Sequence, residues 1–171
     1  VRGRVRCSLL VETVGAAATL AECVRVPGVD EVHIGLNDLH LEQGLDFMFE
    51  LVANGTVDGL AAVLRDAGLP FGIGGLARVG DGMLPAELLV AEHARLGSSA
   101  AILSRAFHRN ASSVEQIRAE MDFAGEVQKL RDVYEHYRCA APEQLQAAHA
   151  SVQTGVQAIV AAIRARRVNG E

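Results

Sequence analysis

Two carboxylates, Glu12 and Asp38, come shortly after two short apolar segments, residues 9–11 and 32–36. The residues between these segments have helical spacing, which is typical of a strand–helix–strand unit with parallel strands. Neighbouring parallel strands end at the same edge of a sheet, where α/β proteins gather their ligands. We therefore expect Glu12 and Asp38 to face one crevice and to offer carboxylate oxygens to a divalent cation.

Each of these residues also has an ordinary structural interpretation. Glu12 alone is typical of an acidic residue at a helix start, where the helix dipole stabilises it. Asp38 alone is typical of a loop or N-cap residue. Gly35, Leu36 and Asn37 indicate a tight turn, or a place where backbone N–H groups approach a bound anion. The position of both carboxylates at successive strand ends favours the metal site.

Alternating strands and helices are expected to position these residues. The strands are predicted at residues 5–11, 30–35, 70–75 and 99–104. The helices are predicted at residues 15–26, 45–53, 57–67 and 84–96, with a polar loop at 36–44. This alternation indicates a parallel sheet. The first strand is rich in Val and Leu, so we expect it to be buried on both faces.

The pattern changes after residue 110. Apolar residues recur at helical spacing from 114 to 137, with Ser112 or Ser113 as the expected N-cap. A second amphipathic helix is predicted at 143–166. The last helix would pack on a neighbouring subunit, on a further domain, or on the side of its own chain.

The motifs around the two carboxylates resemble those of the metal-dependent HpcH/HpaI aldolase and citrate lyase β family. VETV at 11–14 is similar to the family's (I/V)-E-T strand end, and VPGVDEVHIGLNDLHLEQG at 26–44 to its V-P-G-V-D turn and G-P-N-D-L strand end. The resemblance continues through PFGIGG at 70–75 and LGSSAAILS at 96–104. Leu36 stands where the family usually has Pro, which removes a φ restraint and restores a backbone donor.

The resemblance implies an α/β fold, the C-terminal half of a (β/α)8 TIM-type barrel with four βα units and two long C-terminal helices. Residues 1–110 would be the half-barrel with the metal site, and residues 111–171 barrel helix eight and an extra packing or oligomerisation helix. A complete barrel needs about 250 residues, whereas this chain has 171 and begins on Val1. We expect it to be part of a longer protein, completed by a missing N-terminal half or by a homo-oligomer.

The resemblance also implies a chemistry. Glu12 and Asp38 would bind Mg²⁺ or Mn²⁺, and Gly35, Leu36 and Asn37 would hold the carboxylate of pyruvate or a related 2-oxo acid. The expected activity is that of a carbon–carbon lyase of the class II aldolase type, which joins the oxo acid to an aldehyde or releases it through an enolate. The family's Arg and His base would lie upstream of Val1, so we assign no catalytic residue and expect activity to be incomplete in this chain.

Two alternatives remain open at this point. The first is a CoA-ester lyase similar to citrate lyase β, for which Arg78 and Arg105 are the candidate basic contacts. The second is a non-catalytic half-barrel that serves as a binding or assembly module.

Composition excludes several other classes of function. The net charge is −5 and the Arg residues are scattered, which argues against a nucleic-acid surface. No apolar run approaches the roughly 20 residues of a membrane span. The three cysteines have no metal-ligand spacing. Cys7 and Cys23 lie in apolar segments and are expected to be buried thiols of a cytoplasmic protein.

Overall fold

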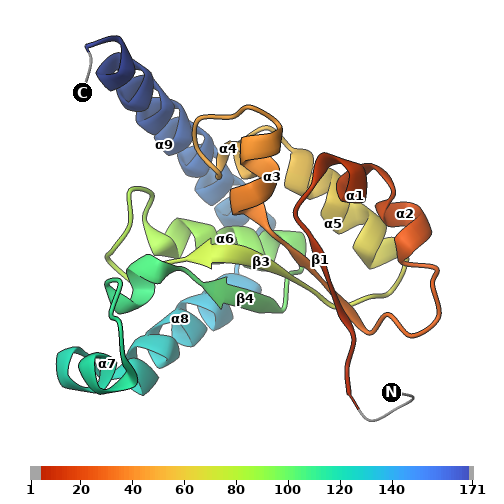
Figure 1. The fold of residues 1–171 in the computed structure, drawn as a ribbon, viewed down its shortest axis with the longest axis horizontal. Helices are drawn as coiled ribbons and strands as arrows, with labels where there is room; N and C mark the ends of the chain where they lie inside the picture. The colour runs from red at the N-terminus through yellow and green to blue at the C-terminus, as the bar shows by residue number, and fades with distance from the viewer. Residues whose placement is uncertain (1–4, 170–171) are drawn as a thin grey trace.

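The computed structural model describes residues 5–169, which form an α/β fold around one parallel sheet (Figure 1). Four strands lie in the order of the chain, β1-β2-β3-β4, and every neighbouring pair is parallel. The strands are β1 (Ser8–Val11), β2 (Glu31–Ile34), β3 (Phe71–Leu76) and β4 (Ala100–Leu103). The predicted parallel sheet is confirmed, and each strand falls inside or within one residue of its predicted range.

Helices connect the strands, and further helices follow β4 toward the C-terminus. They are α1 (Val14–Ala18), α2 (Leu20–Cys23), α3 (Leu36–Glu42), α4 (Glu50–Ala53), α5 (Thr56–Asp66), α6 (Ala86–Leu96), the 3₁₀ turn η1 (Arg105–His108), α7 (Val114–Glu120), α8 (Phe123–Arg138) and α9 (Pro142–Val168). Among the described residues, no helix is both long enough and apolar enough to cross a membrane.

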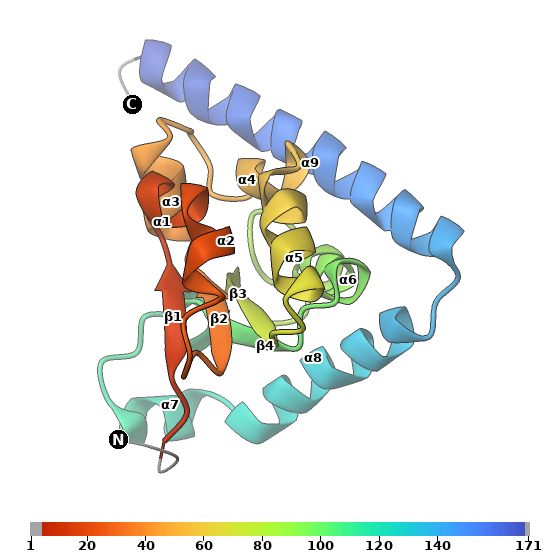
Figure 2. The ribbon, with the colours of Figure 1, turned by 90° about the vertical axis from the view of Figure 1, so that its right-hand side faces the viewer.

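The two faces of the sheet have different surroundings. Val11, Ile34 and Ile73 lie on one face and are buried in the core, together with apolar residues of the helices that cover it. Figure 2 shows α5 and α6 on this side of the sheet. On the other face Leu10 and Ile102 keep about half of their surface, 49% and 52% exposed. One face of the sheet is therefore a helix-covered core and the other is open.

The polar segment after β2 is a helix and not the predicted loop. Leu36, Leu39 and His40 are buried at the spacing of one helical face, and the His40 ring bonds the Leu36 carbonyl oxygen at 3.2 Å. Burial of this face holds α3 against β3 and leaves Asn37 and Asp38 exposed. The predicted helix at 15–26 is also modified, because it breaks at Thr19 into α1 and α2.

The C-terminal region has three helices where two long ones were predicted. Ser113 caps α7 by accepting a hydrogen bond from the Gln116 N–H at 3.1 Å, as expected. Met121 then adopts an extended conformation, and the Asp122 side chain caps α8 by accepting from the Gly125 N–H at 3.1 Å. A capping side chain competes with helix continuation, which is why the periodic pattern splits at this point.

The last helix packs along its own chain. Ala148, Val152, Val156 and Val160 are the buried residues of α9, and the helix contacts α6 and α4. In Figure 2, α8 and α9 form a V that encloses α5 and α6. Of the placements left open by the sequence, packing on the side of its own chain is therefore present.

Two expectations about burial are wrong. β1 is not buried on both faces, since Val11 is its one buried residue and Leu10 is exposed. It is an edge strand of the described sheet, so within residues 5–169 it pairs with a strand on one side only. The two cysteines expected to be buried are also more accessible than predicted, since Cys7 is exposed and Cys23 is half-buried.

Candidate functional site

Glu12 lies directly against the backbone of Gly35 at the end of β1 and β2. The Gly35 N–H donates to the Val11 carbonyl oxygen at 2.8 Å, which continues the pairing of the two strands by one residue. A Cβ atom built on Gly35 would stand 2.9 Å from the Glu12 Cβ and 3.4 Å from its Oε2. Glycine is therefore required here to make room for the Glu12 side chain.

Asp38 reaches the same edge through the start of α3. Gly35 is the N-cap of this helix and Asp38 lies in its first turn, where it is exposed. An acidic side chain in a first turn is favoured by the helix dipole. The strand pairing thus places Glu12 and Asp38 just after the carboxyl ends of neighbouring parallel strands.

Neither carboxylate is neutralised by another side chain. Within residues 5–169, Glu12 and Asp38 take part in no ion pair and no side-chain hydrogen bond of the structure. Glu42, at the far end of α3, instead accepts a hydrogen bond from the Val14 N–H at 2.7 Å. Within the described residues, no side chain therefore competes for the carboxylate oxygens of Glu12 and Asp38.

The donor set suits a cation that keeps part of its water shell. The described part of the chain contains no group of three or more His, Cys, Asp and Glu side chains that could hold a metal. Two carboxylates with the remaining positions left to water or substrate are a common arrangement for Mg²⁺. Glu12 and Asp38 match such an ion by donor type, and they follow adjacent parallel strands.

The three residues predicted to hold a substrate carboxylate have different surroundings. The Gly35 N–H is engaged by Val11, so this residue contributes space and not a donor. Leu36 and Asn37 are the first two residues of α3, and their N–H groups have no carbonyl partner one turn earlier in the helix. The Leu36 side chain is buried at 1% exposure and anchors this turn, whereas Asn37 is exposed.

His33 lies on the open face of the sheet, in the row formed by Leu10, His33, Gly72 and Ala100. Its ring covers Gly72, where a Cβ atom would stand 2.5 Å from the imidazole. Burial lowers the pKa of His33 below its usual value, and its Nε2 is buried with no hydrogen-bond partner among the described residues. The sequence predicts that His33 packs in the core or against a helix, and the glycines of the next strand are a signal for close approach.

Of the two basic residues considered for a CoA partner, Arg78 is already engaged. It is buried and pairs with Asp81 at 2.8 Å. Arg105 is exposed in η1. Of the two arginines considered, Arg105 therefore remains the candidate for contact with a CoA phosphate.

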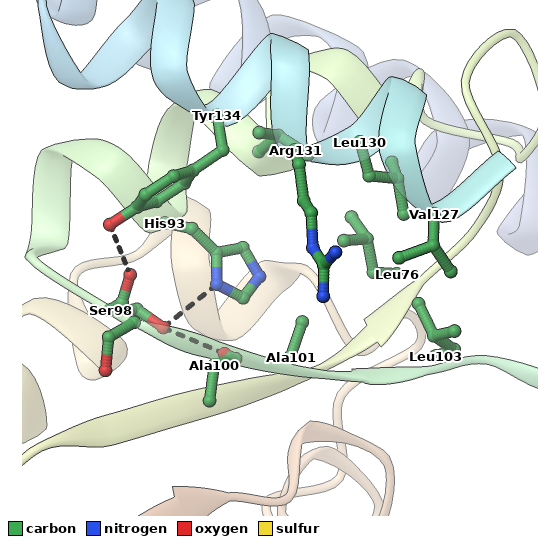
Figure 3. Close-up of a pocket in the computed structure, with 12 residues that line it drawn as sticks. Leu76, His93, Ser98, Ala100, Ala101, Leu103, Val127, Leu130, Arg131 and Tyr134 are labelled. Carbon is green, nitrogen blue, oxygen red and sulfur yellow. Dashed lines mark hydrogen bonds between the residues drawn. The ribbon is translucent and has the colours of Figure 1, made fainter. Parts of the chain in front are cut away.

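A cavity of about 310 Å³ lies away from the carboxylate pair, between β4, α6 and α8 (Figure 3). His93, for which the sequence identifies no partner, meets Ser98 at its wall with 2.9 Å between Nδ1 and Oγ. We base the metal site on Glu12 and Asp38 and not on this cavity, because its lining contains no carboxylate.

Comparisons of the chain with protein-family models, with curated proteins and with solved structures find no match in any of the three. The fold therefore defines the chain as an α/β protein with a parallel sheet, in which Glu12 and Asp38 follow adjacent strands and form no ion pair within residues 5–169.

Proposed function

We propose that the chain is the metal-binding half of a (β/α)8 barrel lyase that acts on pyruvate or a related 2-oxo acid, as in the HpcH/HpaI aldolase and citrate lyase β family. One observation carries the proposal. Glu12 and Asp38 follow adjacent parallel strands, and the Glu12 side chain occupies the space that Gly35 leaves beside the first turn of α3.

Glu12 and Asp38 would hold Mg²⁺ or Mn²⁺. When bound, such a cation supplies the Lewis acidity that stabilises an enolate. The chain's own contribution is to position the carboxylates: Gly35 is tied to Val11, and the buried Leu36 fixes the helix start that presents Asp38. We assign proton transfer to no residue of the described chain.

The amides of Leu36 and Asn37 would orient the substrate. They stand at the positive end of α3, where backbone N–H groups attract a carboxylate. The replacement of the family's usual Pro by Leu at position 36 is compatible with this role. Position 36 is the first residue of α3, and Pro is favoured at this position because its missing N–H breaks no helical bond. Leu36 therefore retains the turn and adds a donor.

The open face of the sheet supports the half-barrel part of the proposal. Leu10 and Ile102 are about half exposed on this face, and within the described residues β1 and β4 each pair on one side only. A barrel closes by pairing its first and last strands, which removes such edges. A second set of βα units would complete the sheet and enclose the row that contains His33.

Calorimetric titration of Mn²⁺ into the 171-residue chain tests the metal site. Glu12→Gln and Asp38→Asn should each weaken binding, and the double variant should abolish it. Glu22→Gln is the matched control, because Glu22 is an exposed acid on α2 away from the strand ends. Unchanged binding in the double variant would refute the site.

The chemistry is tested by exchange of the pyruvate methyl protons in D₂O. We expect the chain to bind oxalate, an enolate analogue, in a metal-dependent way and to exchange protons slowly. Each missing acid–base group typically removes a factor of about 10² to 10⁴ in rate. A version completed with four further βα units should exchange faster. If the completed protein binds the metal but does not exchange the pyruvate methyl protons, a non-catalytic binding module would be favoured instead.

A further inference from the structure

The cavity between β4, α6 and α8 has mostly apolar walls (Figure 3). Leu76 and Leu103 contribute from the sheet, Val90 from α6, and Val127 and Leu130 from α8. Its volume of about 310 Å³ is at the lower end of the range of small-molecule sites. The space exists because α8 leaves part of the helix-covered side of β4 exposed, including Ala101.

The polar groups at one end of the cavity already satisfy one another. His93 Nδ1 lies 2.9 Å from Ser98 Oγ, which donates to the Ala100 carbonyl oxygen at 3.1 Å. The Tyr134 hydroxyl donates to the Ser98 carbonyl oxygen at 3.0 Å. Burial lowers the pKa of His93 to about 4, so its ring is neutral at pH 7. This end of the cavity therefore adds no charge.

Arg131 is the one charged side chain among the described residues that line the cavity. Figure 3 shows its side chain extending from α8 toward Ala101. Within residues 5–169 it forms no ion pair, whereas the acids that follow it on α8 have other partners. Asp132 accepts a hydrogen bond from Gln128 at 2.8 Å, and Glu135 pairs with Arg138 at 2.7 Å.

A single unpaired cation beside an apolar space defines one kind of ligand. We propose that this cavity binds a small monocarboxylate with an apolar body, its carboxylate on Arg131 and its body between β4, α6 and α8. A second anionic group has no counter-charge in the lining. The site lies on the helix-covered side of the sheet, so it is separate from the Glu12 and Asp38 edge and independent of the proposed lyase activity.

Calorimetry with octanoate and the 171-residue chain tests the proposal. We expect one octanoate per chain. Arg131→Gln should weaken binding by about tenfold or more, because it removes a charge-assisted hydrogen bond. Lys129→Gln is the matched control, since it removes an exposed charge of the same helix that does not line the cavity and leaves the pair of Glu135 with Arg138 intact. Octanol should bind about as weakly to the wild-type chain as octanoate binds to Arg131→Gln.

Filling the cavity separates this site from other apolar surfaces. Ala101 is exposed, so Ala101→Phe places a ring in the open space and should abolish octanoate binding while the circular dichroism spectrum is retained. Glu12→Gln should leave octanoate binding unchanged, whatever it does to Mn²⁺. Failure of wild-type chain to bind octanoate, or equal binding by Ala101→Phe or Arg131→Gln, would overturn the proposal.

Discussion

The Glu12 side chain lies in the space where Gly35 has no side chain. The distance from the Glu12 Cβ to a Cβ built on Gly35 would be only 2.9 Å, and the Leu10 Cδ1 would be 3.3 Å from the same point. Gly35 has φ −88°, a value that any residue adopts. Glycine is therefore needed at position 35 because a side chain would meet Glu12, and not because of its backbone conformation. The carboxylate and the glycine thus form one unit at the strand end.

This contact predicts the effect of Gly35→Ala. The added methyl group must displace Glu12, so Mn²⁺ affinity should fall by about tenfold to a hundredfold, as for other changes that misplace a metal ligand. Overpacking should also lower the free energy of unfolding by about 1–3 kcal/mol. Calorimetry and urea unfolding measure the two effects. Gly59→Ala is the control, because nothing lies within 4 Å of the new methyl group in α5 and helix propensity should raise stability by up to about 1 kcal/mol.

Acid should destabilise the fold through His93. Burial lowers its pKa to about 4 in the folded chain, against 6.5 for the free side chain. Between these two pH values the unfolded chain binds more protons, so stability rises with pH there. The contribution of His93 is complete above about pH 6.5 and is lost as the pH falls toward 4, an effect of about 3 kcal/mol.

Urea unfolding at pH 7, 6, 5 and 4 measures this dependence. His93→Gln should be less stable at pH 7 by about 1 kcal/mol, because the bond to Ser98 is weakened. The same variant should show a smaller loss between pH 7 and pH 4. Equal pH slopes for the two proteins would mean that His93 is not the titrating group.

Glu92 should be a strong stabilising residue. It is 2% exposed and joins two helices, with Oε2 accepting from Arg95 at 2.6 Å and Oε1 lying 3.0 Å from His149 of α9. Glu92→Ala leaves Arg95 with Asp58 alone and removes the contact to α9, so we expect a loss of about 3 kcal/mol in urea unfolding.

The control for this prediction is Glu135→Ala. That residue pairs with Arg138 on the surface, where both side chains are more than half exposed, and its loss should cost under about 1 kcal/mol. Similar losses for the two variants would contradict a special role for the buried carboxylate.

The open face of the sheet should make the 171-residue chain associate. Leu10 and Ile102 are exposed apolar residues near the two outer strands, and such edges pair with other chains. Leu10→Lys with Ile102→Lys should shift sedimentation toward the monomer. Val168→Lys, which removes an exposed apolar residue at the end of α9, should have no such effect. A monodisperse wild-type monomer would argue against a half-barrel.

The order of strands and helices could be predicted because the turn residues and the spacing of apolar residues indicate the same element boundaries along residues 5–104. Gly68 and Gly97 end α5 and α6 in left-handed conformations, and each is followed closely by the next strand. The position of Glu12 and Asp38 at one edge follows from this order alone. The helix α3 was missed because its exposed residues, Asn37 and Asp38, are typical of a loop, while its buried face shows only in the packed structure.

The contact between His93 and Ser98 could not be predicted from local sequence patterns, because it depends on the geometry of the turn at Gly97. Gly97, with φ +80°, reverses the chain after α6, so that the Ser98 N–H donates to the His93 carbonyl oxygen at 2.9 Å. This turn also places the two side chains together. The cavity beside them depends on the angle of α8 against β4, which no sequence period encodes.

The long reach of α9 has a consequence for how the chain is made. His149 meets Glu92 across 57 residues, Gln153 bonds the Ala53 carbonyl oxygen across 100, and Arg164 meets Asp46 across 118. Such distant contacts form late because long loops must close first. During synthesis on the ribosome, the surfaces of α4 and α6 that α9 covers remain exposed to solvent until the C-terminal turns of α9 emerge. The nascent chain therefore reaches this packing only after α9 has been synthesised.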